Sequence, residues 1–278
     1  MSGCTGNCES CGHKNQEGGT CSVSPLTKIP HKLLVLSGKG GVGKSTVAAA
    51  LSVMLAKAGK KVALLDVDFH GPSQPTLFGL KDVRMDGTEA GLCPVEKYGV
   101  RVVSIGLLME NADSAVIWRG PAKIGVLNQL FQEVDWSDTE YLVMDFPPGT
   151  GDEVLSACQT VPGEKMAVIV TTPQEVALAD CRKCVDFCRQ VNVPVAGIVE
   201  NMSYFVCPDC SKKHELFLSG GGARLAESAG VDLLARLPLD PQFLKLCDEG
   251  KIAEGIEQSP VLKGELKMAL VDIVSREA

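Results

Sequence analysis

Short apolar runs alternate with helix-length stretches along most of the chain. The runs that predict strands lie at residues 33–37, 62–67, 100–105, 141–146, 166–171, 195–199 and 233–237. The stretches that predict helices lie at 45–58, 121–133, 152–160, 175–191, 221–229 and 260–275. Nearly continuous apolar strands separated by helices are typical of a parallel sheet covered on both faces. We therefore expect an α/β fold, a mostly parallel sheet whose ligands bind beyond the carboxyl ends of the strands.

Two kinds of segment interrupt this pattern. Residues 1–25 are rich in Gly, Ser and Cys and nearly free of apolar side chains, so burial cannot offset the entropy of ordering them. We expect a short Cys-rich N-terminal arm over 1–25 and one folded domain over 26–278. Residues 80–99 and 202–220 are polar stretches with Gly and Pro, which we interpret as surface insertions in that domain.

Composition narrows the class of protein. The 278 residues are 45% hydrophobic and 22% charged, which is enough apolar material for a large core. The formal net charge of −7 argues against a surface that coats nucleic acid and against a polybasic membrane anchor. No run of 18 apolar residues and no apolar signal core is present, so we expect a cytoplasmic protein with neither membrane nor nucleic acid as a partner. The 12 cysteines then stay reduced, as metal ligands or small core residues.

Residues 38–46 read Gly-Lys-Gly-Gly-Val-Gly-Lys-Ser-Thr, directly after a predicted strand and directly before a predicted helix. This fits the phosphate loop of P-loop NTPases, in which backbone N–H groups and a helix N-terminus bind phosphate. Lys44 is expected to reach the β- and γ-phosphates and the Ser45 hydroxyl to ligate Mg²⁺. We therefore expect ATP and Mg²⁺ as cofactors, bound by the loop residues Gly38, Lys39, Gly40, Gly41, Val42, Gly43, Lys44, Ser45 and Thr46.

Four further charged residues belong to this expected site. Lys39 is a second lysine inside the loop, and it faces its own nucleotide, projects toward another subunit or is simply a solvated surface lysine. Asp66 and Asp145 each end a predicted strand, where a carboxylate can hold Mg²⁺. Asp68 lies two residues beyond Asp66, on the same face of the strand, and is placed to address the metal and the attacking water.

Two groups of cysteines predict metal sites. Cys207 and Cys210 lie on a Pro-containing turn, a spacing that directs two thiolates at one point and suits Zn²⁺ or an iron–sulfur cluster. His214 can supply a third ligand to zinc, or a second subunit can donate an identical pair of thiolates; the residues leave both open. The arm offers four more thiols for a cluster or zinc: Cys4, Cys8, Cys11 and Cys21.

The remaining cysteines are interpreted as structural. Cys181 and Cys184 also have the Cys-x-x-Cys spacing, but they lie inside a predicted helix with Cys188 on the same face. Packed structural thiols are the favoured interpretation there. Three isolated cysteines are read as core or surface thiols: Cys93, Cys158 and Cys247.

Taken together, these motifs resemble those of the Mrp/ApbC-type (Nbp-like) iron–sulfur cluster carrier ATPases. That family lies in the deviant-Walker-A class of P-loop NTPases, with MinD, ParA and the nitrogenase iron protein. The resemblance covers roughly residues 30–275 and is carried by GKGGVGKST (38–46), DVDFHGPSQP (66–75), WRGP (118–121), DFPPGTGDE (145–153), ENMSYFVCPDC (200–210) and PLDP (238–241).

The resemblance implies a homodimer with slow ATP hydrolysis near the interface. In it, Lys39 matches the lysine that reaches the partner's nucleotide, and Asp68 the acid that positions the hydrolytic water. Asp66 and Asp145 support Mg²⁺. Positions near the adenine base are matched by Asn201, Pro238 and Asp240.

For the metal sites, the resemblance implies a [4Fe–4S] cluster that Cys207 and Cys210 share with their copies in the other subunit. Some relatives carry a second cluster in an N-terminal arm, but the spacing of Cys4 to Cys21 departs from theirs. The implied function is an ATP-dependent assembly and carrier protein that transfers a [4Fe–4S] cluster to apo iron–sulfur proteins. A spatial-organising ATPase of the MinD/ParA type and a zinc-stabilised NTPase without a cluster role are the alternatives.

Overall fold

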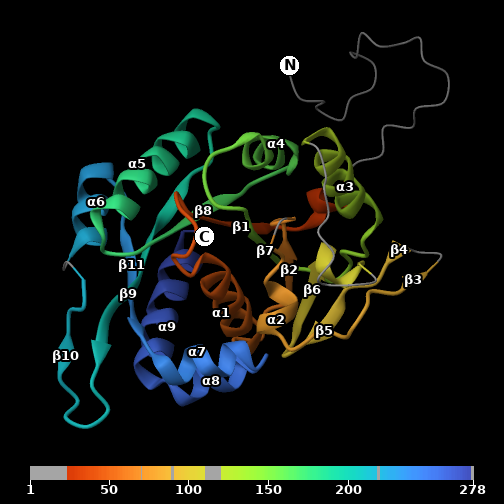
Figure 1. The fold of residues 1–278 in the computed structure, drawn as a ribbon. Coiled ribbons are helices and arrows are strands. Elements are labelled where there is room, and N and C mark those ends of the chain that lie inside the picture. Colours follow the sequence, from red (N-terminus) through yellow and green to blue (C-terminus); the bar gives the residue numbers. More distant parts are fainter. Residues whose placement is uncertain (1–23, 70, 89–90, 110–119, 218–219, 277–278) are drawn as a thin grey trace, which may run out of the picture.

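The computed structural model describes residues 24–278 apart from residues 70, 89–90, 110–119, 218–219 and 277–278. Within these residues the chain forms one sheet of nine strands, in the order β10-β9-β8-β1-β7-β2-β6-β5 with β11 on the other side of β9, and a separate β3–β4 hairpin (Figure 1). The strands are β1 (His31–Leu36), β2 (Val62–Asp66), β3 (Gly87–Thr88), β4 (Gly91–Leu92), β5 (Val95–Lys97), β6 (Val100–Ser104), β7 (Tyr141–Asp145), β8 (Met166–Thr171), β9 (Val195–Val206), β10 (Lys213–His214) and β11 (Leu233–Leu239).

The sheet pairs in parallel from β6 across to β11, and its two short outer strands β5 and β10 are antiparallel. Because β1 lies in the middle, between β7 and β8, the loop that follows it opens at the centre of the carboxyl edge. The neighbouring strands β2 and β7 end at the same edge with Asp66 and Asp145, which are paired in register. This topology brings three separate sequence motifs to one place.

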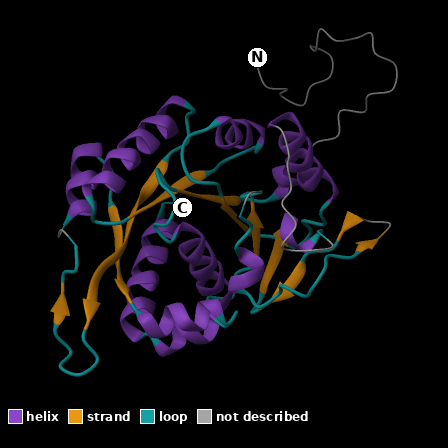
Figure 2. Ribbon diagram, viewed as in Figure 1, coloured by secondary structure: helices purple, strands orange, loops and turns teal. Residues whose placement is uncertain are grey.

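Helices cover both faces of the sheet (Figure 2). One layer contains α1 (Lys44–Lys57), α2 (Gln74–Leu77), α7 (Pro241–Asp248), α8 (Ile252–Gln258) and α9 (Pro260–Ser275). The other contains α3 (Gly120–Glu133), α4 (Asp152–Thr160), α5 (Glu175–Gln190) and α6 (Gly221–Ala229). Two 3₁₀ turns complete the described elements, Pro25–Lys28 and Ile105–Leu107.

The central helix α1 is buried on nearly all sides because it packs against the sheet as well as against α8 and α9. Its small residues Ala48, Ala49 and Ala50 are at most 2% exposed, and they allow a close approach to the strands. A helix that is apolar all round belongs in the interior of a large domain. The N-terminus of α1, which carries the phosphate loop, is therefore held by the core.

The predicted α/β class is confirmed, and all seven predicted strands and six predicted helices are present. Their bounds agree within two residues, except that β9 ends at Val206 and not at residue 199. The prediction of an insertion at 202–220 was wrong in its first part, because β9 continues through Val206 and pairs with both β10 and β11. The other stretch, 80–99, adopts the short strands β3, β4 and β5. The sequence reading missed these strands and the short helices α2, α7 and α8, which are too short for a clear periodicity.

The division into an arm over 1–25 and a domain over 26–278 stays a prediction. Cys4, Cys8, Cys11 and Cys21 lie outside the described residues. Among the helices that the structure does describe, none has both the length and the hydropathy needed to cross a bilayer.

Candidate functional site

The phosphate loop joins the end of β1 to the start of α1, as the sequence predicts. Gly43 is the N-cap of α1 and has φ 82°, a backbone conformation that disfavours side chains other than glycine. Gly38 lies against the backbone of α5, so that a Cβ added to it would stand 2.3 Å from the carbonyl carbon of Asp180. Both glycines are therefore required by backbone geometry, and the loop's N–H groups are left at the positive end of the α1 dipole.

Lys44 is buried, and its ammonium forms an ion pair with Asp145 at the end of β7. The same ammonium lies 3.2 Å from the Ser45 hydroxyl. Gln74, at the start of α2, donates from its side-chain amide to the other Asp145 oxygen at 2.7 Å and to the backbone carbonyl of Ser45 at 3.1 Å. Lys44, Gln74, Asp145 and the half-buried Ser45 thus form one connected network.

Asp66 completes this network from the end of β2. Its carboxylate is fully buried and accepts hydrogen bonds from the backbone N–H groups of Gln74 and Asp68, each at 3.2 Å, and from the Ser104 hydroxyl at 3.2 Å. Burial, with the nearby Asp145 carboxylate, raises the pKa of Asp66 well above its usual value. Two buried carboxylates beside a serine hydroxyl are a donor set that suits Mg²⁺, whose charge would relieve their repulsion.

The two remaining predicted catalytic residues lie nearer the surface. Asp68 is half-buried in the loop after β2, and one of its oxygens accepts from the backbone N–H of Gly71 at 3.3 Å. Lys39 is exposed at the outer turn of the phosphate loop, where its carbonyl accepts from the Ser37 hydroxyl at 3.0 Å. The ammonium of Lys39 is therefore available to a nucleotide or to a second chain.

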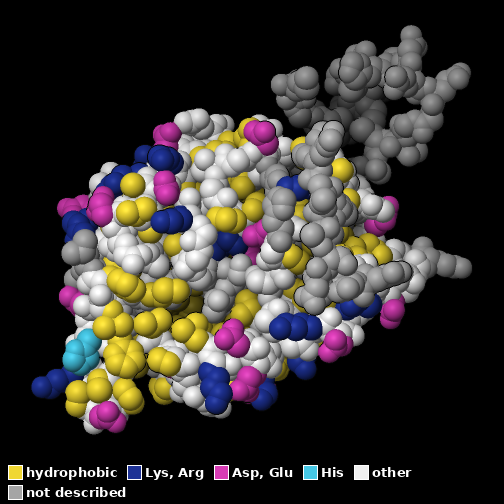
Figure 3. All heavy atoms as spheres, viewed as in Figure 1, with side chains coloured by type: hydrophobic (Ala, Val, Ile, Leu, Met, Phe, Trp, Pro, Cys, Tyr) yellow, Lys and Arg dark blue, Asp and Glu magenta, His cyan; other side chains and the backbone are white. Residues whose placement is uncertain are grey.

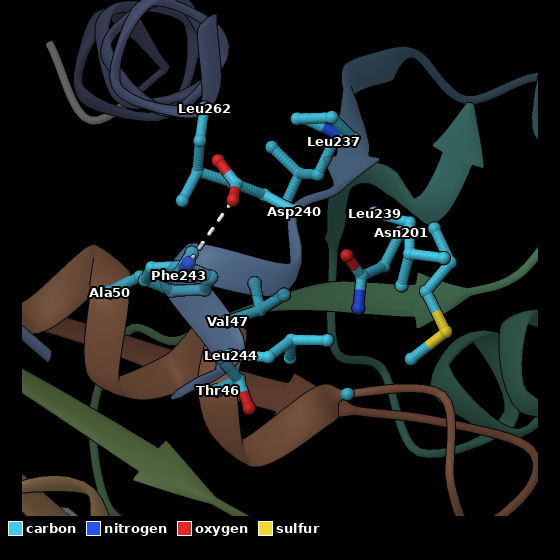
Figure 4. A pocket seen from close by; sticks show the side chains of 13 residues that line it. Thr46, Val47, Ala50, Asn201, Leu237, Leu239, Asp240, Phe243, Leu244 and Leu262 are labelled. Carbon is cyan, nitrogen blue, oxygen red and sulfur yellow. Dashed lines mark hydrogen bonds between the residues drawn. The ribbon is translucent and has the colours of Figure 1, made fainter. Parts of the chain in front are cut away.

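A pocket opens beside the phosphate loop, between α1, β9, β11 and α7 (Figure 4). Its lining includes the three residues that the resemblance places near the adenine base: Asn201, Pro238 and Asp240. Asn201 also donates from its amide to the Val42 carbonyl at 2.9 Å, so it contacts the loop directly. Asp240 is the N-cap of α7 and accepts from the backbone N–H groups of Gln242 at 3.0 Å and Phe243 at 3.1 Å.

Asn201 reaches the loop because β9 bulges at this point. Glu200 is in register with Arg236 of β11, whereas Tyr204 is in register with Pro238, so β9 uses two extra residues over the same length. Met202, inside the bulge, has φ 53°, which is unusual for a residue with a side chain. The strained bulge turns Asn201 toward the pocket beside the phosphate loop while β9 continues to the hairpin.

That hairpin, between β9 and β10, carries Cys207, Cys210 and His214. The two sulfurs and a ring nitrogen of His214 lie within 4.8 Å of one another, close enough to ligate one metal. The backbone N–H groups of Cys210 and Asp209 point at the Cys207 sulfur and lower the pKa of this thiol. Cys210 and His214 are exposed and Cys207 is half-buried, so the group is accessible from outside.

The cysteines of α5 are different. Cys181, Cys184 and Cys188 are 0% exposed, and Cys184 and Cys188 are hydrogen-bonded to each other, which with burial raises the pKa of Cys184. Burial also raises the pKa of Cys158 and of Cys247 to about 12. The hydrogen bond from Cys184 lowers the pKa of Cys188. All five thiols are buried in the core, which agrees with the interpretation of the helical cysteines as packed structural residues. Cys93 is partly exposed, and its thiol donates to the Thr88 hydroxyl at 3.9 Å.

The fold and the loop define the class of this protein as a P-loop NTPase with a second lysine in its Walker A loop. The sequence model of the family described as ParA, NUBPL iron-transfer P-loop NTPase, matches residues 28–273. This chain belongs to that family. The predicted fold and family are therefore confirmed.

Individual relatives agree with this assignment. An iron–sulfur cluster carrier protein of Methanocaldococcus jannaschii is 42% identical over 264 residues, 90% of each chain. The cytosolic Fe-S cluster assembly factor Nubp2 homolog of Anopheles gambiae is 50% identical over 232 residues, 81% of this chain and 89% of that protein. A solved nucleotide-binding protein of Archaeoglobus fulgidus in complex with ADP is 41% identical with a TM-score of 0.73, over 82% of this chain and 90% of that one. The MinD cell-division ATPase of Pyrococcus furiosus shares the fold, with a TM-score of 0.61 over 90% of this chain and 100% of that one. The two sequences are 23% identical.

Sequence reasoning missed Gln74 and Ser104, which hold the two buried carboxylates. Gln74 lies in the stretch 66–75 that carried the resemblance, but its role depends on how α2 folds back over Asp145. Ser104 ends β6, the neighbour of β2, and the pairing of Asp66 with Ser104 is visible only in the sheet register.

Proposed function

We propose that this chain is an ATP-dependent carrier that binds a [4Fe–4S] cluster through the β9–β10 hairpin and transfers it to apo iron–sulfur proteins. The observation that carries the proposal is the cluster of Cys207, Cys210 and His214 at the exposed end of the strand that also contacts the phosphate loop. The names of the relatives, an iron–sulfur cluster carrier and a cytosolic cluster assembly factor, support it. The relatives named cytosolic assembly factors favour a cytoplasmic location.

In the nucleotide half of the cycle, Lys44 and the loop N–H groups bind the β- and γ-phosphates of ATP. Ser45, Asp66 and Asp145 would hold Mg²⁺, which would neutralise phosphate charge. Lys44 exchanges its ion pair with Asp145 for the phosphates when ATP enters. Asp68 orients the attacking water, since it lies at the mouth of the same network. Asn201 and the wall at Pro238 and Asp240 receive the adenine base.

We infer that the working unit is a homodimer. One hairpin supplies two thiolates, and a four-iron cluster is held by four. A two-fold axis at the hairpin brings two identical pairs together. Figure 3 shows hydrophobic side chains gathered in the region of the β9–β10 hairpin and toward α7. Large apolar side chains are exposed on these segments, at Leu216 and Phe217 directly after β10 and at Leu244 in α7. Such a patch suits a protein interface, and Lys39 is exposed at the nucleotide end for the partner's ATP.

The strand β9 offers a route between the two sites. Next to Asn201, the buried Glu200 accepts hydrogen bonds from Gly222 at the start of α6 and from Ser203. Arg236 of β11 donates to Glu200 at 3.3 Å and to Ser203 at 3.0 Å. These hydrogen bonds fix β9 to α6 and β11 at the residues between the phosphate loop and the hairpin. A displacement of Asn201 is therefore transmitted along β9 toward Cys207.

The test is anaerobic reconstitution of the full chain with iron and sulfide. We expect the Cys207→Ala/Cys210→Ala variant to lose about two iron and two sulfide per chain, its share of a bridging four-iron cluster. Cys93→Ala, which removes a lone thiol outside the hairpin, serves as the matched control and keeps the full complement. A double variant that retains all the iron would refute the assignment.

A zinc-stabilised NTPase is the second candidate, favoured by the position of His214 beside the two thiols. Metal analysis of protein isolated without oxygen separates the two candidates. Zinc bound without iron or labile sulfide supports the zinc site, and iron with sulfide supports the carrier.

A further inference from the structure

A second cavity, of about 870 Å³, lies at the opposite edge of the sheet from the nucleotide site. It is bounded by the amino ends of β1, β8 and β9, near Lys32, Lys165 and Val195, with the end of α9 alongside. The phosphate loop follows the carboxyl end of β1, so the full length of that strand separates the two cavities. The site described above makes no use of this edge.

Two ammonium groups line the cavity without an ion-pair partner among the described residues. Lys32 is only 2% exposed, and its ammonium donates to the backbone carbonyl of Ile29 at 2.6 Å. Lys165 is half-buried and donates to the backbone carbonyl of Val161 at 2.6 Å. A lysine ammonium has three N–H donors, so each group keeps donors in excess of this contact.

Burying positive charge without a counter-charge costs free energy, and buried charges in proteins are normally paired. Burial and the charge of Lys165 lower the pKa of Lys32, against a weaker opposing effect of Glu164. Burial also lowers the pKa of Lys165. Lys44 gives the contrast within the same chain, because its buried ammonium is neutralised by Asp145.

The rest of the lining indicates what kind of anion fits. Met166, Val191, Val195 and Ala196 present apolar surface to the cavity. Arg276, at the rim, is already ion-paired with Asp232. The carboxylate of Glu164 also lines the cavity and acts on Lys32 from a distance, but it forms no ion pair with either lysine, so the cavity keeps a net positive charge. A bare inorganic ion would contact the lysines and leave this apolar surface uncovered, whereas an organic anion covers it.

We propose that this cavity is a binding site for a small organic dianion, a phosphate monoester or a dicarboxylate, held by Lys32 and Lys165. The two negative charges match the two ammonium groups, and the carbon body packs on the apolar wall. The site is separate from the nucleotide site and from the hairpin. If the anion does not bind here, the proposed carrier function is therefore unaffected.

The test measures thermal unfolding of the full chain with Mg²⁺ and a non-hydrolysable ATP analogue in excess, which fills the α-, β- and γ-phosphate positions and keeps the probes from the phosphate loop. The probes are glycerol 3-phosphate, succinate and inorganic phosphate, each titrated to millimolar concentrations. We expect glycerol 3-phosphate or succinate to raise the melting temperature more than inorganic phosphate does, and the one that acts identifies the ligand chemistry. The increase disappears in Lys32→Met and in Lys165→Met. It persists in Lys61→Met, which removes the same charge from an exposed lysine outside the cavity.

A second measurement tests whether Lys32 serves only to stabilise the fold. Without added anions, Lys32→Met is expected to be at least as stable as Lys61→Met, because the substitution removes an uncompensated buried charge. The proposal is overturned if neither organic anion acts, if inorganic phosphate acts as strongly as they do, or if the response survives in Lys32→Met. It is also overturned if Lys32→Met unfolds markedly earlier than Lys61→Met or fails to fold.

Discussion

Cys207 and Cys210 in the β9–β10 hairpin have the same spacing as Cys181 and Cys184 in α5, but the two pairs lie in opposite environments. The hairpin pair is accessible, stands beside His214, and includes a thiol whose pKa is lowered by backbone N–H groups. The helical pair is 0% exposed and packed in the core. Cys-x-x-Cys spacing therefore marks a metal site only where the backbone turns both sulfurs outward to one point.

The largest expected difference between the pairs is in chemical reactivity. With iodoacetamide at neutral pH, the native metal-free chain should alkylate at Cys207 about a thousandfold or more faster than at Cys184, because Cys184 reacts only when the core opens. Mass spectrometry of peptides from a time course measures both rates. Comparable rates at the two positions in the native chain would contradict the structure, and equal rates in urea are the control.

For stability the order is reversed, because a substitution in the helical pair should cost more free energy of unfolding than one in the hairpin pair. Cys184→Ser places a more polar hydroxyl in the apolar interior and is expected to lower the free energy of unfolding by about 1–3 kcal/mol. Cys210→Ser, at an exposed position, should change it by no more than about 0.5 kcal/mol. Urea unfolding of the two matched variants measures both values. A larger loss for Cys210→Ser would mean that the hairpin thiols are structural.

His214 sharpens the comparison at the hairpin itself. If the hairpin prefers zinc, His214→Ala should weaken zinc binding by about tenfold or more, because a ligand is lost. If four thiolates hold a cluster, iron and sulfide per chain stay unchanged. Competition with a chromophoric zinc chelator and anaerobic iron analysis give the two readings. The exposed Lys212→Ala, two residues away, is the control.

The smallest expected effect is a shift along the pH axis. Because hydrogen bonds from Cys210 and Asp209 lower the pKa of Cys207, its alkylation rate should rise at lower pH than that of an ordinary thiol. Cys158 and Cys247, with pKa values of about 12, should stay protonated and unreactive across the same range. Stopped-flow alkylation between pH 6 and 9 follows the rise. The same profile for Cys207 in native and unfolded protein would show that the hairpin geometry does not act on the thiol.

Ion pairing also distinguishes two buried lysines at opposite edges of the sheet, because Lys44 is paired with Asp145 whereas Lys32 donates to a backbone carbonyl. Lys44 could be assigned from its motif, because the loop that places it is local and glycine-rich. Lys32 begins an ordinary apolar strand, and nothing near it in the sequence predicts a buried ammonium. Its environment arises from Lys165 and Val195, more than a hundred residues away, which meet it across the sheet edge.

The sequence by itself determined the alternating strands and helices, the phosphate loop at 38–46, and the acids that end β2 and β7, because periodicity and turn chemistry act over a few residues. Only the tertiary structure decided the path of β9 past residue 199, the bulge that turns Asn201 to the loop, the closure of Gln74 over Asp145, and which Cys-x-x-Cys pair faces outward. These features depend on strand register and on contacts between residues far apart in the chain. The packing free energy of the whole chain decides which of these contacts form, so they cannot be predicted from the pattern of a short sequence segment.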